Sequence, residues 1–150
     1  MIKILEHWHN VVAKQIYTVF QNSYKIEAKL IGTQNFPPLF RSVQDIEHAN
    51  SQFYGYFEDN SLAAVVEIVI NGSQLEIDSF TVDPKYFRKG IANKLLHFVL
   101  SEIDYSKAVV ETAVANTPAI NLYKKQGFVE FKRWTPSHGI EKLAMSIEAN

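Results

Sequence analysis

A short basic stretch between two apolar runs is the part of this sequence best suited to chemistry. Arg88, Lys89 and Gly90 follow an apolar run and directly precede residues with helical spacing that begin at Ile91. The first amide N–H groups of a helix lack intrahelical acceptors and lie at the positive end of its dipole, and glycine lets an anion approach the backbone. The stretch therefore predicts a phosphate-binding loop, with an ordinary strand-to-helix turn as the alternative. It contains neither a Walker sequence nor a G-x-G-x-x-G fingerprint.

A second well-delimited segment runs from Asn116 to Gly127. Asn116 is a good helix-capping residue, Pro118 suits the first helical turn, and Gly127 is typical of a helix end. The predicted helix carries Tyr123, which by itself is expected to pack and to form a hydrogen bond.

Four acidic residues lie within predicted strands: Glu67, Glu76, Asp78 and Glu111. Such carboxylates can accept a proton, orient a cationic amine or serve the structure alone. We interpret Glu67 and Glu76 as structural or substrate-lining residues. The five histidines lack metal-ligand spacing, and the absence of cysteine excludes a cysteine nucleophile and disulfides.

Composition limits the classes of partner. The chain has 150 residues, 47% of them hydrophobic, and a formal net charge of -1. We expect one domain over residues 1–150, with no nucleic-acid or membrane partner. The most apolar run, Leu62–Ile70, is too short to span a bilayer and contains an acidic residue. The N-terminus does not resemble a secretory signal, so we predict a cytoplasmic protein.

Apolar spacing and turn residues predict the elements that hold these residues. An Asn71-Gly72 turn between β-rich runs indicates a hairpin. We expect an α/β (α+β mixed) protein with a single mixed, mostly antiparallel sheet flanked by helices. The predicted order is helix Val11–Ile31, helix Val43–Ala49, strands Gln52–Phe57, Leu62–Ile70 and Leu75–Val82, helix Ile91–Leu100, strand Ala108–Val114, the helix between Asn116 and Gly127, and strands Phe128–Trp134 and Ile140–Ile147.

Taken together, the two segments resemble the GCN5-related N-acetyltransferase (GNAT) superfamily. That family has a Q/R-x-x-G-x-G/A loop and, later, an N-x-x-A-x-x-x-Y-x-x-x-G-F helix. The loop matches at Gly90 and Ala92, whereas Phe87 stands where the family usually has Gln or Arg. The helix motif matches at Asn116, Ala119, Tyr123, Gly127 and Phe128. The resemblance implies the acyl-CoA N-acyltransferase fold, acetyl-CoA as co-substrate and no metal.

The resemblance also implies where acetyl-CoA binds. The pantetheine arm is expected along the strand ending at Val82, in an opening between this strand and Ala108–Val114, with the pyrophosphate on the basic loop. The implied cofactor-binding residues are Phe80, Thr81, Val82, Arg88, Lys89, Gly90, Ile91, Ala92, Asn93, Asn116, Ala119 and Tyr123.

Direct acetyl transfer to a primary amine, in a ternary complex, is the implied reaction. It needs a neutral amine and a proton for the departing thiolate. The family places a tyrosine at Tyr123, which we predict to donate that proton. Asp78 is our first expectation for the base, and Glu111 matches the position used by a branch that acetylates protein N-termini. Either carboxylate could instead orient the amine, with bulk solvent removing the proton.

The family's acceptor site implies a contribution from aromatic residues here: Tyr24, Phe36, Phe40 and Trp134. The expected acceptor is a small-molecule amine or a peptide N-terminus. Phe36–Phe40 could also act as a mobile lid. A non-catalytic acetyl-CoA-binding sensor of the same fold is the alternative function, and exposed edge strands make a homodimer plausible.

Overall fold

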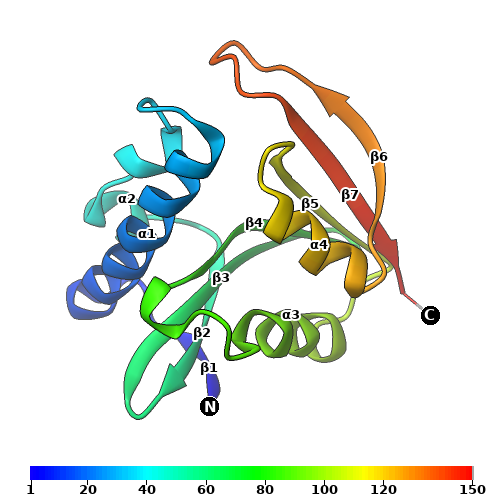
Figure 1. Ribbon diagram of the computed structural model, residues 1–150. Helices are drawn as coiled ribbons and strands as arrows, with labels where there is room; N and C mark the ends of the chain where they lie inside the picture. The colour runs from blue at the N-terminus through cyan, green and yellow to red at the C-terminus, as the bar shows by residue number, and fades with distance from the viewer. Residues whose placement is uncertain (150) are drawn as a thin grey trace.

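A seven-stranded sheet forms the middle layer of the computed structural model, which describes residues 1–149 (Figure 1). The strand order is β1-β2-β3-β4-β5-β7-β6, with β4 and β5 parallel and every other neighbouring pair antiparallel. The predicted mixed, mostly antiparallel sheet is confirmed. The strands are β1 (Ile2–Leu5), β2 (Gln52–Glu58), β3 (Ser61–Asn71), β4 (Gln74–Val82), β5 (Lys107–Ala113), β6 (Val129–Trp134) and β7 (Lys142–Glu148).

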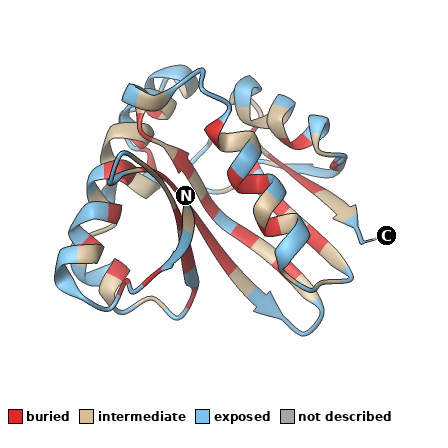
Figure 2. Ribbon diagram, turned by 90° about the horizontal axis from the view of Figure 1, so that it is seen from below, coloured by how far each residue is buried: buried red, intermediate tan, exposed pale blue. Residues whose placement is uncertain are grey.

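Helices cover both faces of the sheet. One apolar cluster joins α1 (Asn10–Ile31) and α2 (Val43–Glu47) to the sheet, and a second joins α3 (Ile91–Glu102) and α4 (Thr117–Lys125) to it. In Figure 2 the buried residues lie on the sheet and on the inward sides of the helices. Single 3-10 turns, η1 (Pro37–Phe40) and η2 (Pro84–Tyr86), begin at prolines, which suit a first helical position. No helix within residues 1–149 is long and apolar enough to cross a membrane.

The first strand is absent from the sequence-based prediction, which gave six strands. β1 has only four residues, and only Leu5 among them is buried. It pairs with β2 as an edge strand, so its other edge has no strand partner among residues 1–149. A pattern this short carries too little alternation to be recognised in the sequence.

Two irregularities in β4 shape the region in which the site lies. A β-bulge leaves Asp78 without a partner in β3, because Ile77 pairs with Ile68 and Ser79 pairs with Glu67. The parallel pairing with β5 also stops at Ile77 and Val110. Beyond this point β4 and β5 diverge (Figure 1), so the β5-facing edge of β4 from Asp78 to Val82 has no strand partner in the described chain.

Candidate functional site

A groove of about 420 Å³ lies between the end of β4, the start of α3 and α4. Gly90 caps α3 in the left-handed conformation, with φ +74°, and Arg88 has φ +65°. These turns bring the chain from η2 into α3, whose first N–H groups have no intrahelical acceptor. The groove is lined by Phe80, Val82, Tyr86, Phe87, Arg88, Gly90, Ile91, Ala92, Asn93, Pro118, Ala119, Asn121, Leu122, Tyr123 and Lys125.

This groove suits a ligand with an apolar arm and an anionic end. A helix N-terminus with a nearby guanidinium favours phosphate groups, and the unpaired edge of β4 offers backbone donors and acceptors to an extended ligand. Lys89 lies outside the lining, and its ammonium pairs with Glu58 at 3.3 Å. The Thr81 side chain is buried and directed to the carbonyl of Val65.

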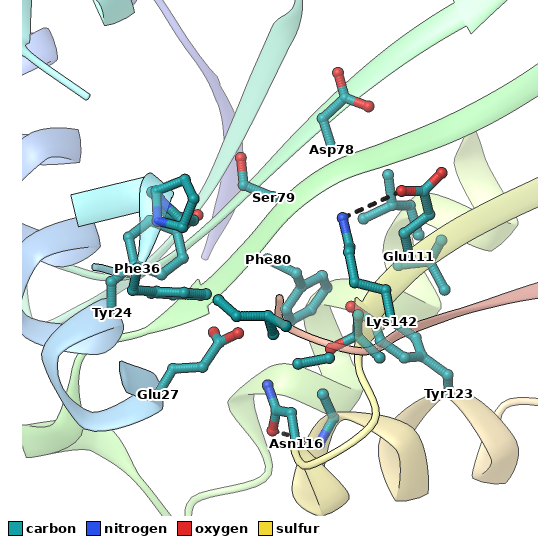
Figure 3. Close-up of a pocket in the computed structure, with 18 of the residues that line it drawn as sticks. Tyr24, Glu27, Phe36, Asp78, Ser79, Phe80, Glu111, Asn116, Tyr123 and Lys142 are labelled. Carbon is teal, nitrogen blue, oxygen red and sulfur yellow. Dashed lines mark hydrogen bonds and ion pairs between the residues drawn. The ribbon is translucent and has the colours of Figure 1, made fainter. Parts of the chain in front are cut away.

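A second cavity, of about 240 Å³, adjoins the groove (Figure 3). Both are lined by Phe80, Ala119 and Tyr123, so the two form a continuous site. Other lining residues come from α1, η1, β4, β5 and the segment between β6 and β7. Divergence of β4 from β5 opens this space, which corresponds to the opening between these two strands that the resemblance implies.

Asp78 lies at the exposed rim of the cavity. Partial burial, together with the charges of Glu67 and Glu76, raises the pKa of Asp78 to about 6. Its carboxylate is therefore ionised at neutral pH, yet basic enough to accept a proton. Glu111 also lines the cavity, but it is exposed and bound to the Lys142 ammonium at 3.2 Å.

Two buried tyrosines face the same cavity. Tyr123 is 4% exposed and packs edge-on against Phe80 and Phe128. Its hydroxyl forms no hydrogen bond within residues 1–149, and burial raises its pKa, so it stays protonated. Tyr24 is 8% exposed, and burial likewise raises its pKa. The cavity thus holds protonated hydroxyl groups beside an ionised carboxylate.

Glu27 is a cavity residue that sequence reasoning missed. It lies on α1, one turn after Tyr24, and it lines the cavity with Asn116 and Lys142. Burial raises the pKa of Glu27, although the Asn116 side chain and the Lys142 charge oppose that rise. Helical spacing of three residues from Tyr24, a predicted acceptor-site residue, is the signal that could have identified Glu27.

A buried ion pair supports the cavity wall. Arg41 follows η1 and donates to both carboxylate oxygens of Glu67, at 2.6 and 2.9 Å. The hydroxyls of Ser51 and Ser79 also donate to Glu67. Burial favours the neutral acid, but these hydrogen bonds outweigh it and lower the pKa of Glu67. Glu67 thereby ties η1 to β4 next to Asp78, consistent with its predicted structural role.

The predicted acceptor residues divide into two groups. Tyr24 and Phe36 line the cavity and pack edge-on against each other, with ring centroids 5.8 Å apart. Phe40 is 70% exposed and outside the lining, and Trp134 is also outside it, in contact with Lys132 and Lys142. From η1, the cavity is instead lined by Pro37 and Pro38.

Comparison with known proteins identifies the family. A family model described as an acetyltransferase (GNAT) domain matches residues 32–149. The chain belongs to the GNAT acetyltransferase family. This confirms the resemblance seen in the two sequence motifs, and acetyl-CoA is the co-substrate that this family uses.

One relative of this GNAT chain is UPF0157 protein YqkA of Bacillus subtilis, 35% identical over 141 residues. The match covers 93% of this chain and 41% of YqkA, so the chain spans about two fifths of that relative.

Two solved structures have the same fold. The ribosomal-protein-S18-alanine N-acetyltransferase of Escherichia coli superposes with a TM-score of 0.77 at 18% identity, covering 99% of this chain and 92% of that one. The PaiA N-acetyltransferase of Thermoplasma acidophilum, in complex with coenzyme A, gives a TM-score of 0.77 at 18% identity, covering 99% of each chain. These matches confirm the predicted acyl-CoA N-acyltransferase fold.

Proposed function

We propose that this chain is an acetyl-CoA-dependent N-acetyltransferase that transfers an acetyl group directly to a primary amine of a small molecule or protein N-terminus. The observation that carries the proposal is the continuity of the groove and the cavity, which meet at Phe80, Ala119 and Tyr123. A thioester lying at this junction would face an acceptor in the cavity. The chain has no cysteine, so no cysteinyl thioester can form on it, which favours direct transfer.

The residues that line the groove supply the binding site for acetyl-CoA. N–H groups at the start of α3 and the guanidinium of Arg88 suit the pyrophosphate, since Phe87 replaces the usual Gln or Arg. The unpaired edge of β4 from Asp78 to Val82 suits the amides of the pantetheine arm.

Two side chains are assigned to proton transfer. The acceptor nitrogen attacks the thioester carbonyl carbon, a C–N bond forms and the C–S bond breaks. Asp78 receives the amine proton, directly or through water, and Tyr123 supplies a proton to the departing sulfur. The products are an amide and CoA with a free thiol. The pKa of Asp78, about 6, suits a base at neutral pH. Glu111 is the weaker candidate because Lys142 occupies its carboxylate.

Release of the CoA thiol, followed with a thiol reagent, tests this function. Background from the protein is absent because the chain has no cysteine. A panel of primary amines should include at least one that accelerates thiol release. Tyr123→Phe should lower kcat about 100-fold or more, the usual contribution of a general acid, with a smaller change in KM for acetyl-CoA.

Tyr105→Phe is the matched control, because Tyr105 is partly buried but lies outside the groove and the cavity. Equal kcat values for the two variants would remove Tyr123 from the mechanism. Tight acetyl-CoA binding without amine-dependent thiol release would instead favour the sensor function.

A further inference from the structure

The cavity carries more negative charge than proton transfer requires. Its charged lining comprises Glu27, Asp78 and Glu111 against the single ammonium of Lys142, with His138 at the exposed edge. Lys142 is bound to Glu111. Asp78 on β4 and Glu27 on α1 remain as two separate carboxylates, drawn at different sides of the cavity in Figure 3.

Glu27 has no role in the acetyl transfer described above, and its position is costly. A carboxylate turned into a partly buried wall loses hydration, and for Glu27 the Asn116 side chain and the Lys142 charge offset this loss in part. The Asn116 side-chain oxygen already accepts the N–H of Ala119 at 3.3 Å, so only its amide nitrogen is free to serve Glu27. A cationic ligand group would provide the missing compensation.

The surroundings of Glu27 also suit a cation. Tyr24 and Phe36 form an aromatic wall beside it, and aromatic faces attract ammonium groups. Independently, the Tyr123 side chain is more than nine-tenths buried and lines the same cavity, and its hydroxyl has no hydrogen-bond partner within residues 1–149. The cavity is thus equipped for a polar ligand. Its volume of about 240 Å³ leaves room for a short compound.

We propose that the acceptor is a short aliphatic diamine, with one amino group presented to Asp78 for acetylation and the second bound as an ammonium by Glu27. The inference rests on the proposed acetyltransferase function. Two carboxylates on different elements match the two charges of a diamine, whereas a simple monoamine would leave Glu27 with only the charge of Lys142, which is already paired with Glu111. The second ammonium is not deprotonated, so Glu27 acts in specificity and not in catalysis.

Equilibrium binding tests this inference without relying on turnover. Calorimetric titrations of the chain saturated with CoA compare 1,4-diaminobutane with butylamine, which has the same carbon chain and one amino group. We expect the diamine to bind about 10-fold tighter or more, as for a charge-assisted hydrogen bond. Glu27→Gln should remove most of this preference, and Glu27→Asp should retain part of it. Glu102→Gln, on the exposed end of α3, should keep it in full.

Equal affinities for the two amines, or a preference that survives in Glu27→Gln, would overturn the inference. Thiol release measured on the same samples separates it from the proposed function. A diamine that binds through Glu27 without releasing CoA would refute the acetyltransferase function and leave the diamine site standing. Equal acetylation of both amines, independent of Glu27, would refute the diamine site and support the acetyltransferase function.

Discussion

Replacing Arg41 with Met should reveal how strongly the buried ion pair supports the fold. The guanidinium donates twice to Glu67, which is 4% exposed, and lies over the rings of Phe20 and Phe53 at 5.8 and 5.7 Å. Methionine keeps an apolar stem against these rings but removes the charge. Glu67 then keeps only the hydroxyls of Ser51 and Ser79 as donors among the described residues.

Breaking a buried pair on one side costs about 3–5 kcal/mol. We expect about 3 kcal/mol for Arg41→Met at pH 7, because the two serine hydroxyls remain. For a chain of this length that corresponds to a fall in Tm of about 6–12 °C. In the unaltered protein the pKa of Glu67 is lowered, so its contribution is present above the unfolded pKa and is lost as pH falls through the folded value.

The variant should reverse this pH dependence. Without Arg41, burial dominates and raises the pKa of Glu67 above its unfolded value, so the folded variant gains stability as acid protonates the carboxyl. The stability difference should therefore be largest at pH 7 and shrink towards pH 4. Adding Glu67→Gln to Arg41→Met should recover much of the loss at neutral pH, because no charge remains buried.

Urea unfolding followed by circular dichroism at both pH values measures these differences. Arg133→Met is a matched control, since Arg133 makes a similar two-bond pair with Glu130 at 2.6 and 3.0 Å, but at the surface. That variant should hardly change stability. A loss for Arg41→Met no greater than for Arg133→Met, or one that is the same at both pH values, would refute the reasoning.

Three further predictions concern the proposed site. In the unaltered protein the rate should rise with pH as Asp78, with a pKa of about 6, loses its proton. Asp78→Asn should lower kcat/KM and abolish this rise. An unchanged pH profile would reject the base assignment. Gly90→Ala and Gly72→Ala should each destabilise the fold by about 1 kcal/mol, because both glycines have positive φ. An added Cβ would meet open space at both positions, so no steric clash should add to this cost. Only Gly90→Ala should weaken acetyl-CoA binding in calorimetry. Saturating acetyl-CoA should raise Tm, and Arg88→Ala should reduce this shift more than Lys89→Ala does; the opposite order would contradict the groove assignment.

Most of the fold could be predicted because its signals are local. Apolar spacing identified the helices, and the Asn71-Gly72 turn correctly placed the hairpin between β3 and β4. β1 was missed because its pairing with β2 depends on residues about fifty positions away in the sequence. The bulge at Asp78 was equally invisible, since it depends on the register with β3 and not on the residues of β4 alone.

In the site, too, residues within local motifs were predicted and residues brought in from distant segments were missed. The two motifs led to residues that line the groove and the cavity, because each motif occupies one loop and the adjoining helix turn. Glu27 was missed because α1 is far from both motifs in sequence and approaches them only in the folded chain. The aromatic character of Phe40 and Trp134 did not reveal that neither side chain lines the cavity. The cytoplasmic location and the homodimer stay predictions.

The bulge at Asp78 also determines which face of the sheet each later side chain of β4 occupies. Before the bulge, Leu75 and Ile77 pack in the cluster with α3; after it, the even-numbered Phe80 takes this side, while Ser79 turns to Glu67 on the α1 side. One extra residue in a strand of period two exchanges its faces. Deleting Asp78 would remove the bulge and leave Ser79 and Phe80 on their present faces, because Ile77 and Ser79 already pair with adjacent residues of β3. The face that a residue of β4 takes is therefore set by its position relative to the bulge, and not by its amino-acid type.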